Sequence, residues 1–228
     1  NLQKPKHLSC LLINNKIMNN PLLNTELLPK FNEIHAEHIE EAIDYVLDDN
    51  RQRIKALLDS DGEISWENSI AILEQLNDRL NRTWSPASHL HSVADNDALR
   101  KAYNACLPKL SEYATEMGQN TKLFDLFKTL SESDAYQNLE QAQKKIIENA
   151  LRDFHLSGID LATDKQQQYK TLQQELSALQ TKFEENLLYA TNAYKKQITD
   201  ESQLSGLPES ALALAKQTAE KEKMDGWV

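Results

Sequence analysis

The sequence predicts an all-α protein built as a multi-helix bundle, and three observations lead there. Glycine and proline together number 5 + 6 = 11 of the 228 residues, about 5%, against ordinary usage of roughly 12%. So few turn-forming residues argue against a sandwich or barrel, which needs a turn every 8–12 residues or so. Apolar residues recur at spacings of three and four, and 40% hydrophobic content is enough for a core.

The first predicted helix runs from about Ala36 to Asp59, after an irregular stretch over residues 18–34. Its apolar positions share one helical face and are Ile39, Ile43, Val46, Ile54, Leu57 and Leu58. Ser60, Asp61 and Gly62 end it. A second helix begins near Trp66, and Pro86 is expected to break or kink it because proline removes a helical donor and clashes with the preceding turn.

A third helix is predicted over about 98–118, with Leu99, Ala102, Cys106, Leu110 and Tyr113 on one face and a kink at Pro108. Two shorter helices follow at about 121–131 and 139–155. Gly158 then stands where a left-handed residue often ends a helix.

The longest helix is predicted within residues 163–200, where Thr163 and Gln166 form a capping-box pattern. Its apolar stripe has a mean step close to 3.6 and consists of Tyr169, Leu172, Leu176, Leu179, Phe183, Leu187, Ala190 and Tyr194. We expect this stripe to be the core face of a bundle helix; a coiled-coil seam is the alternative. Gly206 interrupts, and a last helix is expected over 208–223 with Pro208 at its first position.

Charge and hydropathy exclude several classes of protein. Asp plus Glu exceed Lys plus Arg by 35 − 25 = 10, and no local basic stripe offsets this excess, so nucleic-acid binding is not expected. No segment approaches the ~20 apolar residues that cross a membrane. The two cysteines, Cys10 and Cys106, form no C-x-x-C pair, which favours a reducing compartment such as the cytoplasm.

Both ends of the sequence carry expectations of their own. Residues 1–17 hold three lysines around a short apolar segment, and we expect a poorly ordered leader or sequence upstream of the true start. Residues 225–228 (Asp-Gly-Trp-Val) set up a turn and an apolar segment. A buried Trp227–Val228 strand would need partners from elsewhere, so we expect this end to be truncated and poorly held.

Two histidine pairs are candidates for metal ligands. His35 and His38 lie three apart, beside Glu37 and Glu41, and could share a helical face. Their spacing is not that of the zinc motif H-E-x-x-H, so a solvated helix start is expected instead. His89 and His91 lie two apart, beside Trp84 and Pro86, and are expected in an extended loop as packing or surface residues.

The remaining reactive groups do not form a recognisable site. Cys106 falls on the apolar stripe of its helix and is expected to be a buried, unreactive thiol. Paired carboxylates occur at 40–41, 48–49 and 184–185 and are expected to be solvated. No glycine-rich phosphate loop or G-x-S-x-G elbow is present. The motifs therefore identify no catalytic, cofactor-binding or metal-binding residue.

Several stretches nevertheless resemble a known family. They are 19–23 (NNPLL), 66–68 (WEN), 85–93 (SPASHLHSV), 142–145 (AQKK), 149–159 (NALRDFHLSGI) and 207–213 (LPESALA). In this order they resemble the amino-terminal part of the thimet-oligopeptidase (neurolysin-like) zinc metallopeptidases, from about Met18 to Val228. The Arg152–Gly158 stretch is the most specific piece.

The resemblance implies that residues 18–228 form the helical amino-terminal lobe of a cytoplasmic peptidase and one wall of a channel that admits short peptides. The family's zinc site is an H-E-x-x-H helix plus a downstream glutamate in the carboxyl-terminal half. None of those residues has a counterpart here, so no catalytic or metal residue is transferred, and this chain alone is predicted to be inactive.

Two hypotheses follow. The chain is either a piece of a zinc endopeptidase, whose reading frame continues into H-E-x-x-H, or a freestanding helical peptide-binding or protein-interaction module. The apolar end at Trp227 and Val228 favours the first.

Overall fold

The computed structural model describes residues 19–24, 28–94 and 96–228, and it is all-α, as predicted. The expected leader at 1–17 and Cys10 lie outside these residues. Two compact units are present, residues 1–178 and 179–228. Within the described ranges the only β pairing is one isolated bridge, between Ile198 and Trp227. None of the helices described is long and apolar enough to cross a membrane.

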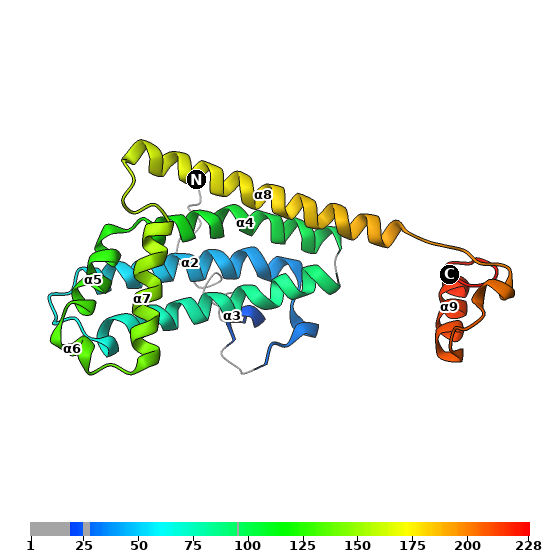
Figure 1. The fold of residues 1–228 in the computed structure, drawn as a ribbon, viewed down its shortest axis with the longest axis horizontal. Coiled ribbons are helices and arrows are strands. Elements are labelled where there is room, and N and C mark those ends of the chain that lie inside the picture. Colours follow the sequence, from blue (N-terminus) through cyan, green and yellow to red (C-terminus); the bar gives the residue numbers. More distant parts are fainter. Residues whose placement is uncertain (1–18, 25–27, 95) are drawn as a thin grey trace, which may run out of the picture. The chain divides into compact units, whose positions relative to one another are not determined.

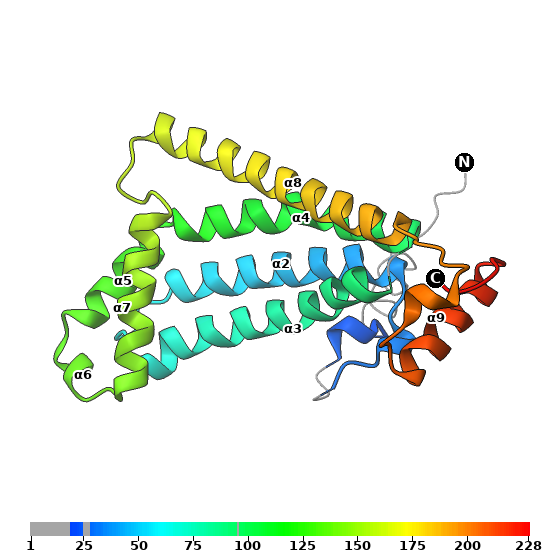
Figure 2. The same ribbon diagram turned by 45° about the vertical axis from the view of Figure 1, so that its right-hand side comes forward.

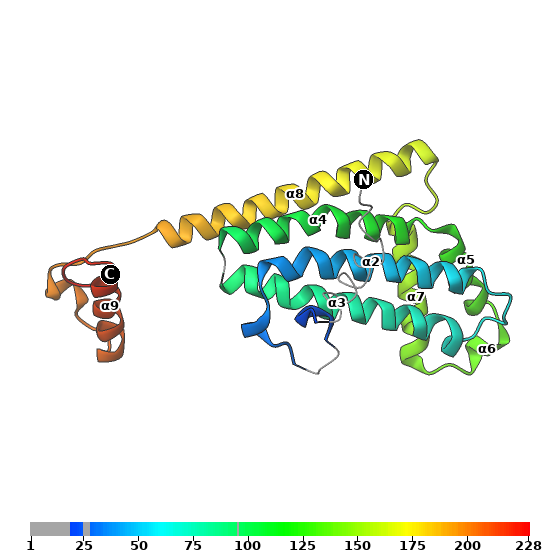
Figure 3. The ribbon, with the colours of Figure 1, turned by 180° about the vertical axis from the view of Figure 1, so that it is seen from behind.

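Three long helices form the body of the first unit: α2 (Ala36–Leu58), α3 (Ala71–Val93) and α4 (Asp97–Gly118). They lie side by side in all three ribbon views (Figures 1, 2 and 3). The predicted apolar face of α2 is its buried face, with Ile39, Ile43 and Val46 fully buried. Burying side chains of this size stabilises the fold by about 1.5–3 kcal/mol each.

Three shorter helices close one end of this layer (Figure 2). They are α5 (Thr121–Ser131), α6 (Asp134–Gln137) and α7 (Gln141–Leu156). Phe154 of α7 is buried against the rings of Phe124 and Phe127, each with its centroid 5.7 Å away. Gly158 has a φ of +85° and ends α7, as its position in the sequence predicted.

Pro86 was expected to break or kink its helix, and a break there is wrong. A short π-helical turn, η3 (Trp66–Ile70), leads into α3, and α3 runs through Pro86 to Val93. Pro86 and Ala87 are both buried in this helix, and their burial offsets the cost of the hydrogen bond that proline cannot make. Pro108 likewise lies inside α4.

Helix α8 (Thr163–Ala193) is the longest, and its 31 residues are unbroken, which confirms the prediction. The expectation that its apolar stripe is a core face is wrong: Leu172, Leu179 and Phe183 are 63%, 64% and 69% exposed. In the first unit, α8 is linked to α4 through its polar side, where the Lys170 ammonium lies 2.6 Å from the Glu112 carboxylate. The stripe therefore faces away from that link.

The second unit contains the end of α8, η4 (Glu201–Leu204) and α9 (Glu209–Lys221). Pro208 is the N-cap of α9 rather than its first residue. The expectation that Trp227 and Val228 are poorly held is wrong. Trp227 exchanges two 2.9 Å backbone hydrogen bonds with Ile198, and the Val228 amide donates to the Ala215 carbonyl.

Candidate functional site

A groove of about 480 Å³ lies between the segment before α2 and one side of α3. Two short 3-10 turns build its outer wall, η1 (Pro21–Leu23) and η2 (Phe31–Glu33). Its lining residues are Pro21, Leu22, Asn24, Leu28, Pro29, Lys30, Phe31, Ile34, Arg82, Ser85, Pro86 and His89.

A buried asparagine fixes the position of η1. The Asn20 side-chain oxygen accepts a hydrogen bond from the Leu22 amide at 3.0 Å, which caps the turn. Its amide nitrogen donates to the His38 carbonyl at 2.8 Å, and this bond ties the turn to α2. Since Asn20 is only 4% exposed, both bonds are shielded from water.

The groove combines apolar walls with basic side chains. Lys30, Arg82 and His89 line it, and no carboxylate stands among the lining residues described, although the chain as a whole is acidic. The Phe31 and His89 rings lie 5.4 Å apart across it. The Arg82 Nε is 2.9 Å from an Asp78 carboxylate oxygen. Such a groove suits a short apolar chain that carries a carboxylate or carbonyl oxygen.

His89 and His91 lie on a helix, not in the expected extended loop, and they point to different places. His89 reaches the groove, whereas His91 is 6% exposed and stacks on Tyr103 with ring centroids 4.1 Å apart. Trp84 also stacks on Tyr103, at 4.7 Å. The interpretation of His91 as a packing residue is confirmed.

His35 and His38 form the start of α2, as the helix-start interpretation expected. The His38 Nδ1 accepts a hydrogen bond from the His35 backbone amide at 3.0 Å. That nitrogen is thereby committed to capping the helix.

Cys106 is fully buried, and burial raises the pKa of its thiol to about 12. Lys109, one turn further along α4, acts in the opposite direction but does not outweigh the desolvation. The thiol is therefore protonated at neutral pH and unreactive, as predicted.

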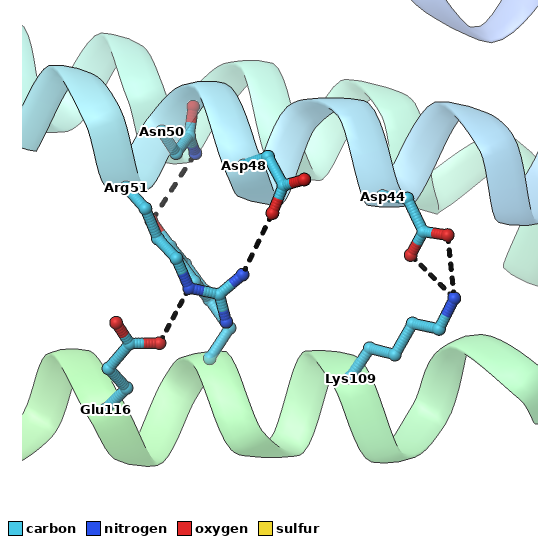
Figure 4. Close-up of polar contacts among 7 residues, drawn as sticks. Asp44, Asp48, Asn50, Arg51, Lys109 and Glu116 are labelled. Carbon is cyan, nitrogen blue, oxygen red and sulfur yellow. Dashed lines mark hydrogen bonds and ion pairs between the residues drawn. The ribbon is translucent and has the colours of Figure 1, made fainter.

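Ion pairs join α2 to α4, and Figure 4 shows two of them, Lys109 with Asp44 and Arg51 with Glu116. Lys109 Nζ of α4 lies 2.6 Å and 2.8 Å from the Asp44 and Glu40 carboxylates. Arg51 Nε lies 2.8 Å from Glu116, and its guanidinium stands 5.4 Å from the Tyr113 ring centroid. These contacts hold α2 against α4, so this cluster is structural.

A buried amide completes the same cluster. Asn50, labelled in Figure 4, is fully buried. Its side-chain nitrogen donates to the Leu76 carbonyl at 3.2 Å and to the Tyr113 hydroxyl at 3.5 Å. Burial raises the Tyr113 pKa, against the lowering effects of Asn50 and Arg51. One residue of α2 thus contacts both neighbouring helices.

The described residues do not fit a zinc site. Among them, no three His, Cys, Asp or Glu side chains are grouped so that they could hold a metal ion. His38 is used as a cap, His91 is buried against a ring, and Cys106 stands alone. The lining of the groove offers recognition by charge and shape.

The groove was missed at the level of sequence, although a signal for it was present. Its lining includes Pro21 and Leu22 of the NNPLL stretch and Ser85, Pro86 and His89 of the SPASHLHSV stretch, more than sixty residues apart. The most specific stretch, residues 152–158, has a packing role instead. Phe154 fills the core, and Ser157 approaches α4 so closely that a Cβ on Gly118 would lie 2.6 Å from its hydroxyl.

Comparison with known proteins agrees with this arrangement. Residues 43–167 match the model of the neurolysin/thimet oligopeptidase amino-terminal domain. The chain is 47% identical to Oligopeptidase A of Haemophilus influenzae over 210 residues. This alignment covers 92% of this chain and 31% of that protein. It is 43% identical over 211 residues to Oligopeptidase A of Escherichia coli, with the same coverage.

A plant protein is similar as well. The Probable cytosolic oligopeptidase A of Arabidopsis thaliana is 34% identical over 203 residues, 89% of this chain and 29% of that protein. The chain thus spans about a third of the length of these relatives. The match covers more than half of the sequence and continues through the three long helices, so this chain belongs to the neurolysin/thimet oligopeptidase family.

Proposed function

We propose that residues 18–228 are the amino-terminal helical lobe of a cytoplasmic zinc metalloendopeptidase of the oligopeptidase A type, which cleaves short peptides. The observation that carries this proposal is the 47% identity to Oligopeptidase A over 210 residues. In this proposal the zinc ligands and the water-activating glutamate come from polypeptide outside this chain. The chain itself contributes one wall of the peptide channel and hydrolyses nothing alone.

The groove beside α3 is the proposed place of peptide contact. A peptide carboxylate would pair with Arg82 or Lys30, while the prolines and Phe31 would receive apolar side chains. Short peptides carry one terminal carboxylate each, so the basic lining supplies recognition that does not depend on sequence.

A chimera tests the assignment as a peptidase lobe. In it, this chain replaces the aligned 210 residues of the Haemophilus influenzae protein and is followed by the rest of that protein. We expect the chimera to hydrolyse a quenched fluorescent peptide in a chelator-sensitive manner, and the 228-residue chain alone to be inactive. A folded but inactive chimera, together with peptide binding by the chain alone, would instead support a freestanding binding module.

Paired arginine variants of the chimera test the groove. Arg82 and Arg53 side chains are 54% and 61% exposed, and each pairs with a carboxylate four residues earlier in its helix. Only Arg82 lines the groove. We expect Arg82→Gln to raise KM about tenfold with little change in kcat, as for the loss of one charge-assisted hydrogen bond. Arg53→Gln is the control, and equal KM values for the two variants would remove the groove from the peptide path.

A further inference from the structure

Helix α8 carries an apolar face made of exposed side chains. Leu172, Leu176, Leu179, Phe183 and Leu187 are 63%, 48%, 64%, 69% and 59% exposed. Tyr194, which follows the helix, continues the line at 75%. We name these six residues the α8 stripe. Single exposed leucines are ordinary, but a row over about four turns of helix, continued by Tyr194, marks a contact surface.

The opposite side of α8 is polar where it meets its own unit. Over residues 163–178 the half-buried side chains are three glutamines (Gln166, Gln173 and Gln174), Lys170, Ser177 and one aromatic residue, Tyr169. Gln166 donates to the Gly158 and Ile159 carbonyls at 3.3 Å, and Lys170 pairs with Glu112. A surface helix normally turns its apolar face toward its own domain, and α8 does the reverse.

The comparisons indicate what should cover the stripe. The match to the amino-terminal domain stops at residue 167, within the first two turns of α8. Similarity to the two bacterial relatives nevertheless covers 92% of this chain, but only 31% of each relative. Most of α8 therefore lies beyond the amino-terminal domain. The part of each bacterial relative outside the alignment is about twice as long as the aligned part.

We propose that the α8 stripe is the surface on which the remaining two thirds of the full-length polypeptide packs, through an apolar face of its own. This inference rests on the proposed function, because it takes that polypeptide to be the peptidase portion. The stripe then serves as an internal interface between the helical lobe and the part that holds the metal.

The pattern of the stripe argues against a second copy of this chain as the occupant. With Ala190 included between Leu187 and Tyr194, the steps from Leu172 to Tyr194 are 4, 3, 4, 4, 3 and 4. Two consecutive steps of four depart from a heptad and unwind a paired coiled coil locally. A broad packed face accommodates this spacing without such unwinding.

Two matched double variants test the proposal, in the chain alone and in the chimera. Leu176→Lys with Phe183→Lys places charges in the stripe. Gln168→Lys with Asn186→Lys places equal charges at exposed polar positions of the same helix. Lysine is a good helix former, so both pairs should leave the thermal midpoint of the chain alone unchanged.

In the chimera, amide exchange in α8 should slow at least about tenfold relative to the chain alone. The stripe variant should abolish this slowing and lower the chimera's thermal midpoint by about 5 °C or more relative to the control. The single variant Phe183→Gln, a milder change, should give a smaller shift in the same direction if the double variant fails to fold.

Three results would overturn the proposal: unchanged α8 exchange in the chimera, equal midpoints for the stripe and control variants, or a dimer of the chain that only the stripe variant dissociates. Peptide hydrolysis is scored separately. An active chimera with an unprotected α8 refutes this inference alone, whereas a protected α8 in an inactive chimera refutes only the proposed function.

Discussion

Substitution of Gly118 by alanine tests the contact between α4 and the most specific sequence stretch. A Cβ at this position would lie 2.6 Å from the Ser157 hydroxyl oxygen and 2.7 Å from the Ser157 Cβ, far inside normal contact. Relieving such overpacking costs about 1–3 kcal/mol, and the helix propensity gained by alanine returns at most about 1 kcal/mol. The net destabilisation should be about 1–2 kcal/mol.

Urea unfolding followed by far-UV circular dichroism measures this cost. With a slope near 2 kcal/mol/M, the midpoint should fall by roughly 0.5–1 M. Because the conflict is with the Ser157 side chain, Gly118→Ala should cost almost nothing in a Ser157→Gly background; this double-mutant cycle isolates the contact. A neutral Gly118→Ala, or an equal cost in both backgrounds, would refute the reasoning.

Three further predictions follow from single contacts. Cys106, whose pKa is raised to about 12 by burial, should resist iodoacetamide at pH 8 in the native protein and react after unfolding, as peptide mass spectrometry would report. The hydrogen bond from Lys170 lowers the Glu112 pKa, so the stabilisation by this pair is present above the unfolded pKa of 4.5 and is lost as pH falls through the folded pKa. Measured by urea unfolding, Glu112→Gln should lower the free energy of unfolding by less than about 1 kcal/mol at pH 7 and should not change it at pH 2. Gly226→Ala should speed amide exchange at Ile198, because Gly226 has a φ of +82° and a Cβ there would lie 2.2 Å from the Ile198 carbonyl oxygen.

The helices were predictable because their signals are local. The predicted 36–59 and the observed Ala36–Leu58 differ by one residue. The capping pattern placed the start of α8 to within one residue, but Thr163 is already helical and the Gln166 side chain donates to the Gly158 and Ile159 carbonyls instead of capping Thr163. The end of α7 was predictable from Gly158, since the residue after the helix has a φ of +85° and glycine adopts positive φ readily.

Features that depend on tertiary contacts were not predictable. Local rules say that Pro86 disfavours a helix, but the burial of Pro86 and Ala87 against the core overrides them. An apolar periodicity identifies the apolar face of a helix but not the element that covers it. For this reason the expectation that the α8 stripe faces the core of the bundle was wrong. The pairing of Ile198 with Trp227 depends on a turn at Gly226 that brings distant residues together.

The candidate groove was predictable only in part. Its lining includes Pro21 and Leu22 of one family-like stretch and Ser85, Pro86 and His89 of another. Their approach depends on Asn20, which ties η1 to the His38 carbonyl of α2. Neither composition nor spacing reveals that bond. Recognition of the family therefore came from the sequence, and the basic lining of the groove from the structure.

Metal content is the most direct test of the central claim, that this chain is a peptidase lobe whose catalytic centre lies outside it. The 228-residue chain and the chimera would be dialysed against the same trace of zinc and analysed by mass spectrometry of the metal. We predict one tightly held zinc ion per chimera, as in a catalytic site with three protein ligands, and no stoichiometric zinc in the chain. One tightly held zinc ion in the chain alone would contradict the claim.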